Sequence, residues 1–213
     1  MSVLLTVFLL CFTVTAATAQ PAPAAPAPQA DTAQRENRAT SGLRFFAGAL
    51  VGLAAHEAGH LVFDIAFDAD PSVKRVDFHG IPFFAVTHRA GLSPKRELAI
   101  SSAGFWVQHA GSEWILTRRP DLRRERAPLV KGILAFNIAT SAAYAGAAFA
   151  RTGPYERDTR GIADSARIDE RWVGALVLAP AALDAWRYLD PDANWAAWTS
   201  RGLKVGMLLL LLR

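Results

Sequence analysis

The apolar residues of this chain are collected into long runs that are separated by short connectors rich in arginine. The long runs cover residues 43–67, 98–117, 129–150 and 172–189. A helix needs about 20 apolar residues to cross a bilayer, so each run is long enough to span one. A shorter run, residues 203–212, adds a further helix of about half that length. The pattern predicts an all-α membrane protein, a bundle of about four to five transmembrane helices.

Residues 72–94 follow a different pattern, in which β-branched and aromatic residues flank a Gly-Ile-Pro break at residues 80–82. Such residues favour strands, and glycine and proline mark turns. We therefore expect a small β-hairpin between the first two core helices. Two histidines of this stretch, His79 and His88, are expected at the surface near the membrane interface.

The first 40 residues form two segments outside this bundle. Residues 1–19 are an apolar run that ends in Ala-Thr-Ala, which predicts a cleaved signal peptide or an uncleaved N-terminal anchor. Residues 20–40 are rich in proline and alanine and then polar, and proline at this density keeps the backbone extended. We expect an exposed linker outside the cytoplasm, followed by a membrane domain over residues 41–213.

Charge and cysteine content narrow the classes of function. The chain has 23 Lys+Arg against 19 Asp+Glu, and the basic residues lie mainly between the apolar runs. This distribution is typical of membrane-flanking charge, and we expect the lipid bilayer and no nucleic acid as a partner. Because Cys11 is the one cysteine, a disulfide framework and a cysteine-based zinc site are excluded.

The first core run contains the motif His-Glu-Ala-Gly-His at residues 56–60. Histidines at i and i+4 share one helix face, so the imidazoles of His56 and His60 can reach one ion. Glu57 projects near the same ion, where it can deprotonate a bound water. Imidazole and carboxylate ligands suit Zn²⁺, and three protein ligands leave a fourth position for water. Simple packing in a soluble bundle is the plain alternative, but inside an apolar span each polar side chain needs a partner.

An HExxH helix followed by a hairpin and further spans resembles the site-2 protease family of intramembrane zinc metalloproteases. The resemblance covers residues 43–190, and its sharp part is the HExxH motif. In that family the third ligand is an aspartate on a later transmembrane helix, typically in an LDG motif. The resemblance implies Asp184 as the third zinc ligand, although Ala185 stands where the family has glycine. It also implies that the hairpin holds substrate in extended form, and that residues 102–105 are a degenerate form of an Ala-Gly-Pro segment.

Other polar residues are alternatives for roles at this site. His109 and Glu113 also lie at i and i+4 on one face of an apolar run, and either is an alternative third ligand. Asp64 is placed to orient a ligand histidine, or else is a helix-end residue at the interface. Asn137 matches a polar asparagine near the family's site. For Asp184, the plain alternative to a metal is an ion pair with Arg187, three residues further on.

Together these features predict an intramembrane zinc metalloprotease that hydrolyses peptide bonds in or near the bilayer. Zinc held by His56, His60 and Asp184 would polarise the scissile carbonyl, and Glu57 would move the proton. The expected substrate is a transmembrane or membrane-proximal protein, and the expected location is a multi-pass position in a bacterial-type inner membrane. The alternative is a non-proteolytic metal-binding membrane protein or a degenerate protease relative, favoured by the missing glycine and the small size.

Overall fold

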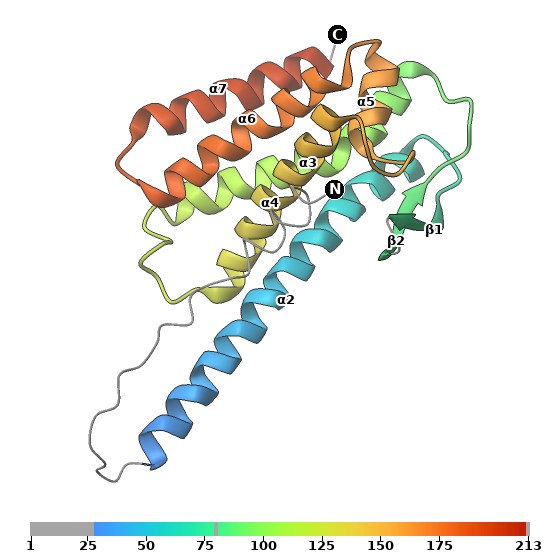
Figure 1. Cartoon of the computed structure of the whole chain (residues 1–213). Coiled ribbons are helices and arrows are strands. Elements are labelled where there is room, and N and C mark those ends of the chain that lie inside the picture. Colours follow the sequence, from blue (N-terminus) through green and yellow to red (C-terminus); the bar gives the residue numbers. More distant parts are fainter. Residues whose placement is uncertain (1–27, 79–80, 212–213) are drawn as a thin grey trace.

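The computed structural model describes residues 28–78 and 81–211 (Figure 1). In this part the chain forms α2 (Pro28–Ala66), β1 (Ser72–Phe78), β2 (Ile81–Thr87), α3 (Pro94–Arg118), α4 (Pro128–Ala150), α5 (Asp158–Ala166), α6 (Glu170–Leu189) and α7 (Asn194–Leu211). The predicted helical architecture is confirmed, and so is a small hairpin between the first two core helices. The predicted signal peptide or anchor over residues 1–19 and the predicted surface residue His79 lie outside the described residues.

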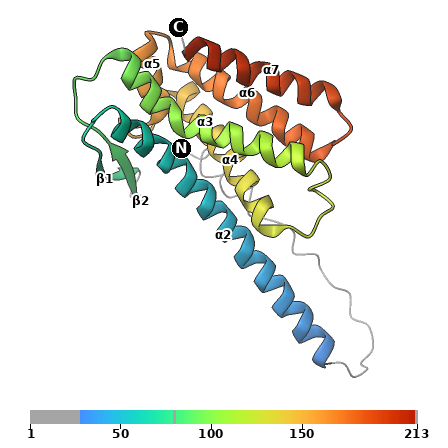
Figure 2. The same ribbon diagram turned by 180° about the vertical axis from the view of Figure 1, so that it is seen from behind.

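Helix α2 is longer than the sequence pattern indicates. An extended linker was expected over residues 20–40, but residues 28–40 belong to the helix. Pro28 is its first residue, a position where the missing N–H is harmless, and the residues that follow include several Ala, Gln, Glu and Arg, which favour helices. The N-terminal half of α2 extends beyond the bundle, as Figures 1 and 2 both show. Its C-terminal half is therefore the part that packs on other helices.

Helix α2 packs against α3 and α4, and its contact with α4 depends on a pair of glycines. A Cβ added at Gly48 would lie 2.0 Å from the carbonyl oxygen of Leu129, and one at Gly132 would lie 1.9 Å from that of Phe45. Each glycine therefore lets the backbone of the other helix approach. Such contacts through small residues are typical of helices that pack in lipid.

The hairpin and the short helix α5 lie near the C-terminal end of α2. Strands β1 and β2 pair antiparallel from Ser72 opposite Thr87 to Phe78 opposite Ile81. The connector of residues 151–171 contains α5, which packs against α3 and α6. A buried cluster holds α5 in place; its members are Phe105, Ala163, Val173 and Val177. Part of this connector is therefore inside the fold.

Two described helical segments, Asn37–Ala66 and Pro128–Ala150, are long and apolar enough to cross a membrane. Large apolar side chains on them are exposed, among them Leu43, Phe46, Leu50, Leu61, Val62 and Ile65 on α2 and Leu129 and Phe149 on α4. Helices α3, α6 and α7 form at the positions of the other predicted spans but do not meet the same criterion. The expectation of four to five transmembrane helices stays a prediction.

Candidate metal site

Both histidines of the HExxH motif face the same point inside the protein. His56 and His60 lie one turn apart on α2, with exposed fractions of 2% and 6%. Their Nε2 atoms are 3.2 Å apart. This is the arrangement that the i, i+4 spacing predicts.

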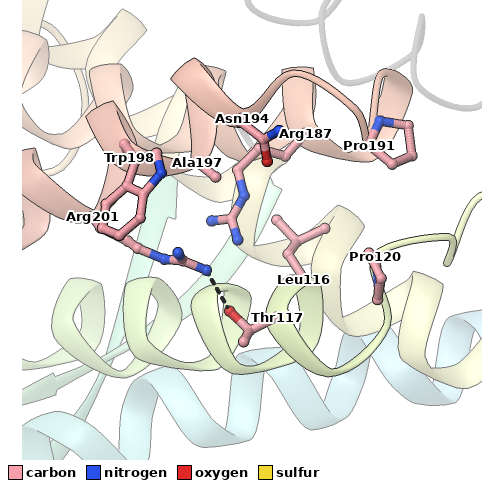
Figure 3. A pocket seen from close by; sticks show the side chains of 9 residues that line it. All are labelled: Leu116, Thr117, Pro120, Arg187, Pro191, Asn194, Ala197, Trp198 and Arg201. Atoms are coloured by element: carbon pink, nitrogen blue, oxygen red, sulfur yellow. Dashed lines mark hydrogen bonds between the residues drawn. The ribbon is translucent and has the colours of Figure 1, made fainter.

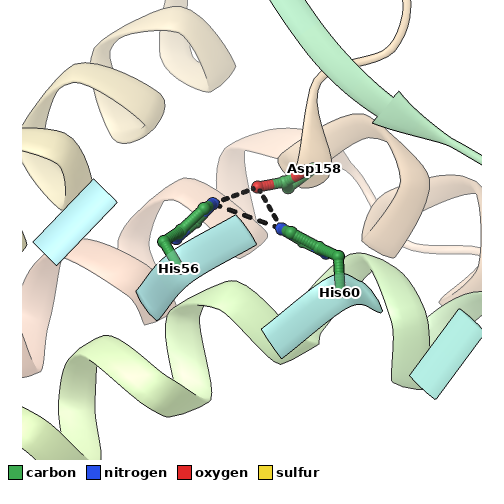
Figure 4. Close-up of side chains that lie close together, drawn as sticks. All are labelled: His56, His60 and Asp158. Atoms are coloured by element: carbon green, nitrogen blue, oxygen red, sulfur yellow. Dashed lines mark hydrogen bonds and ion pairs between the residues drawn. The ribbon is translucent and has the colours of Figure 1, made fainter. Parts of the chain in front are cut away.

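The carboxylate beside these histidines belongs to Asp158, the first residue of α5 (Figure 4). Its Oδ2 atom lies 3.1 Å from Nε2 of His56 and 3.4 Å from Nε2 of His60. Within residues 28–78 and 81–211, these three form the group of histidine and carboxylate side chains that is close enough to hold a metal ion. Asp158 is a site residue that the sequence reasoning did not anticipate.

The spacing of the three ligand atoms fits zinc. In a tetrahedral site with zinc–ligand bonds of about 2.0–2.1 Å, neighbouring ligand atoms lie about 3.3–3.4 Å apart. The three separations here are 3.1, 3.2 and 3.4 Å. The triangle thus has the size of one face of a zinc tetrahedron, with the fourth position left to a non-protein ligand.

The surroundings of Asp158 favour its ionised form, which is the form that binds zinc. Nδ1 of His60 donates a hydrogen bond to the carbonyl oxygen of Ile100 at 2.8 Å, which orients the ring so that Nε2 faces Asp158. Burial opposes ionisation of Asp158, but the two imidazoles outweigh it and hold the pKa of that carboxyl well below its usual range. The charge of this carboxylate can be balanced by a proton on the imidazoles or by a metal ion that all three side chains share.

A buried ion pair fixes the start of α5, and with it Asp158. The guanidinium group of Arg157 binds both carboxylate oxygens of Glu170 on α6, at 2.7 and 2.6 Å. The hydroxyl of Thr159 donates to the same carboxylate at 2.7 Å. Arg157 also donates to the carbonyl oxygen of Pro154 at 2.9 Å. Both neighbours of Asp158 in the sequence are therefore attached to α6, which orients the carboxylate between them.

Helices α3 and α4 enclose the ring of His56. The ring of Tyr144 is stacked on it, with centroids 6.1 Å apart and an interplanar angle of 29°. Phe105 approaches edge-on at 5.7 Å. A Cβ at Gly104 would lie 2.4 Å from the imidazole, so glycine is required at that position. Residues 102–105, noted in the sequence for their likeness to a family segment, are thus the part of α3 that contacts the histidine helix.

Glu57 is half-buried on α2 beside the ligands. It interacts electrostatically with His56, His60 and Asp158, so its carboxylate belongs to the surroundings of the site. Its role as a general base stays a prediction.

Asp184, the expected third ligand, lies in a different cluster. Its buried carboxylate accepts hydrogen bonds from Lys204 at 2.8 and 2.9 Å, from Ser200 at 2.8 Å and from Arg187 at 3.3 Å. Lys204 and Ser200 are on α7, which packs against α6. The charge on Asp184 is therefore balanced by neighbouring cations, and the structure brings Asp158, not Asp184, to the histidines.

The alternative ligands on α3 also lie outside the metal site. Glu113 accepts hydrogen bonds from Arg187, Arg201 and Lys204, so it is part of the cluster around α7. His109 is buried and interacts electrostatically with Lys204. Neither belongs to the group formed by the two motif histidines and the α5 aspartate.

The remaining polar residues singled out from the sequence join elements of the fold. Asn137 donates to the carbonyl oxygen of Gln108 at 3.1 Å and to a serine hydroxyl on α3, which ties α4 to α3.

Asp64 is fully buried and lies 3.4 Å from Nδ1 of His88. His88 also contacts both carboxylate oxygens of Glu97 at 3.0 Å, and its side chain is 17% exposed. His88 is therefore only partly at the surface, because it joins the hairpin to α2 and α3.

No protein-family model, no curated protein and no solved structure matches this chain. The case for the metal site rests on its residues and their geometry.

Proposed function

We propose that the chain is an intramembrane zinc metalloprotease, distantly similar to the site-2 protease family, that hydrolyses peptide bonds of transmembrane or membrane-proximal proteins. The observation that carries the proposal is the triangle of ligand atoms from His56, His60 and Asp158, which has zinc dimensions and lies beside Glu57 of the HExxH motif.

The residues of the site supply the parts that peptide hydrolysis requires. When bound, zinc provides a Lewis acid that polarises a carbonyl group and favours deprotonation of water. Glu57 accepts a proton from the attacking water, whose oxygen bonds to the carbonyl carbon. As the C–N bond breaks, Glu57 returns that proton to the leaving amine. Water is thus added across the peptide bond, and no further reactant is needed.

The position of the site supports a membrane setting. The motif is on α2, one of the two segments of membrane-spanning length and composition. The hairpin lies beside the C-terminal end of α2 in both views of the fold. A two-stranded hairpin leaves the outer edges of its strands available to pair with an extended peptide. Further spans by α3, α6 and α7, in a bacterial-type inner membrane, are part of the same proposal.

Zinc content and cleavage together test the proposal. The full chain is purified in neutral detergent, its zinc is measured by mass spectrometry, and cleavage is followed with labelled casein and with a reporter that contains one transmembrane helix. Wild type should hold near-stoichiometric zinc and cleave a probe. Glu57→Gln should keep the zinc and lose at least about a hundredfold in rate. If wild type and His60→Ala hold equal amounts of zinc, the proposed metal site is wrong. If Glu57→Gln cleaves as fast as wild type, the proposed protease mechanism is wrong.

A second candidate is a metal-binding membrane protein without protease activity. The observation that favours it is the source of the third ligand, which comes from the short helix α5 instead of an LDG-like segment on a later long helix. This candidate would be supported if wild type binds zinc through His60 and Asp158 but cleaves neither probe.

A further inference from the structure

A cavity of about 250 Å³ lies where the ends of α3 and α6 meet the first turns of α7 (Figure 3). It shares no residue with the metal site. Its lining combines two arginines with a tryptophan, two prolines and small polar groups; the residues are Leu116, Thr117, Pro120, Arg187, Pro191, Asn194, Ala197, Trp198 and Arg201. The lining of the cavity therefore combines positive charge with apolar surface.

The charged network behind the cavity has an excess of positive charge. Three cations, Arg187, Arg201 and Lys204, share two carboxylates, Glu113 and Asp184. The exposed fractions of Arg187 and Lys204 are 6% and 8%, so solvent screens this charge poorly. Arg201, the third cation, is more exposed, and an anion in the adjoining cavity would balance the excess charge.

Arg201 is the more exposed of the two arginines that line the cavity, so it is the one that an anion would reach first. Its Nε donates to Glu113 at 2.8 Å. One of its terminal nitrogens donates to Thr117 at 3.1 Å, the bond that is dashed in Figure 3. Its side chain is 37% exposed. The guanidinium carbon lies 5.5 Å from the ring centroid of Trp198, which orients the group at the cavity wall. A guanidinium fork held in this way suits phosphate oxygens.

The surroundings of the cavity have the character of a membrane interface. The connector of residues 118–126 contains five arginines and two acidic residues. Arg123 donates to the carbonyl oxygen of Leu189 at 3.0 Å, which holds this connector at the end of α6. The rings of Trp186 and Trp195 are paired with centroids 5.7 Å apart, and both are exposed. Tryptophan and arginine concentrate where helices leave the hydrocarbon core and meet lipid headgroups.

We propose that this cavity binds the phosphate group of an anionic phospholipid. Arg201 holds the phosphate, with Thr117 and Asn194 as polar neighbours on the cavity wall. The glycerol and the start of the acyl chains lie against Trp198 and the prolines. This lipid site is independent of zinc and of peptide hydrolysis, and it shares with the proposed function only the membrane setting.

Lipid retention tests the proposal. The full chain in neutral detergent is mixed with equal amounts of phosphatidylglycerol and phosphatidylcholine, and bound lipid is counted by native mass spectrometry. Wild type should retain one phosphatidylglycerol with about a tenfold preference, a difference of about 1.4 kcal/mol. Arg201→Gln should lose the preference. Ala197→Leu, which fills the cavity and removes no charge, should lose it too. Arg124→Gln is the matched control, because Arg124 is an exposed arginine of the connector that does not line the cavity.

Three results would overturn the site. They are equal retention of the two lipids by wild type, an unchanged preference in both cavity variants, and an equal loss in Arg124→Gln. If millimolar inorganic phosphate displaces the lipid, the conclusion that the phosphate group comes from a lipid is wrong. Circular dichroism of each variant checks folding, and if Arg201→Gln does not fold, Ala197→Leu decides. Since the readout is bound lipid, its failure leaves the zinc proposal untouched.

Discussion

The imidazole of His56 lies against the backbone of Gly104, where a Cβ would be 2.4 Å from Cε1 and 2.6 Å from both ring nitrogens. Any side chain at this position must displace the ring or separate α2 from α3. We expect Gly104→Ala to weaken zinc binding by about tenfold or more, as loss of a group that orients a ligand does. A competitive zinc titration measures the effect. In Gly111→Ala, a control on the same helix, the new Cβ would meet Asn137 at an ordinary 3.6 Å, and zinc binding should be unchanged. Equal affinities in the two variants would contradict this prediction.

Asp158 and Asp184 should respond differently to the same substitution. Asp158→Asn removes the proposed ligand charge, so zinc affinity should fall at least about tenfold. Asp184→Asn leaves Lys204 without one of its carboxylate partners, so it should lower thermal stability and keep the zinc. Zinc content and a melting curve of each variant in detergent provide the measurement. Loss of zinc in Asp184→Asn alone would restore the ligand set expected from the sequence.

The α2–α4 contact predicts a large effect from one methyl group. In Gly132→Ala the new Cβ would meet the backbone oxygen of Phe45 at 1.9 Å, so the helices must separate, and we expect a loss of about 1–3 kcal/mol. Gly146 is on the same helix and a Cβ there would have nothing within 4 Å. Gly146→Ala should therefore be neutral or stabilising by about 0.5–1 kcal/mol. Unfolding of both variants in the same detergent tests the contact, and a stable Gly132→Ala would show that it does not depend on glycine.

The stabilisation that His88 provides at the base of the hairpin should depend on pH. A hydrogen bond to Glu97 raises the pKa of His88 above its usual value of 6.5, and Asp64 adds to this, while burial and His60 oppose it. The folded-state pKa is thus above the unfolded one. The stabilisation is fully present below about pH 6.5 and is lost as the pH rises through the raised pKa. We expect Glu97→Gln to lower the pKa of His88 in a histidine-selective NMR titration. If the titration curve of His88 is unchanged in this variant, the hydrogen bond to Glu97 is not what raises its pKa.

The metal histidines could be predicted from the sequence because their chemistry is local. Spacing of four residues on one helix is enough to bring the imidazoles of His56 and His60 together, whatever the rest of the chain does. The helices and the hairpin follow from the same kind of short-range pattern. The register of the hairpin and the extension of α2 to Pro28 depend on details of pairing and capping that the pattern does not contain.

Asp158, the proposed third ligand, could not be predicted because its signal is not local. Asp158 stands in a connector with charges of both signs, where a carboxylate is normally solvated. An acidic residue at the start of a short helical stretch after Gly153 and Pro154 was the available signal. Asp184 attracted attention because it lies within an apolar run, and Lys204, the cation that balances it, is 20 residues further on. Only the packing of α7 on α6 reveals that partner.

His56 and Asp158 are 102 residues apart in the sequence. During synthesis, the two histidines therefore emerge from the ribosome well before the third ligand, and α3 and α4 are made in between. If the three residues hold zinc in a membrane protein, as we propose, the ion cannot find its full set of ligands until those helices are in place and α5 has folded against them. Zinc uptake would thus come at the end of biogenesis, and a nascent or truncated chain that stops before α5 would carry the HExxH motif without a complete metal site.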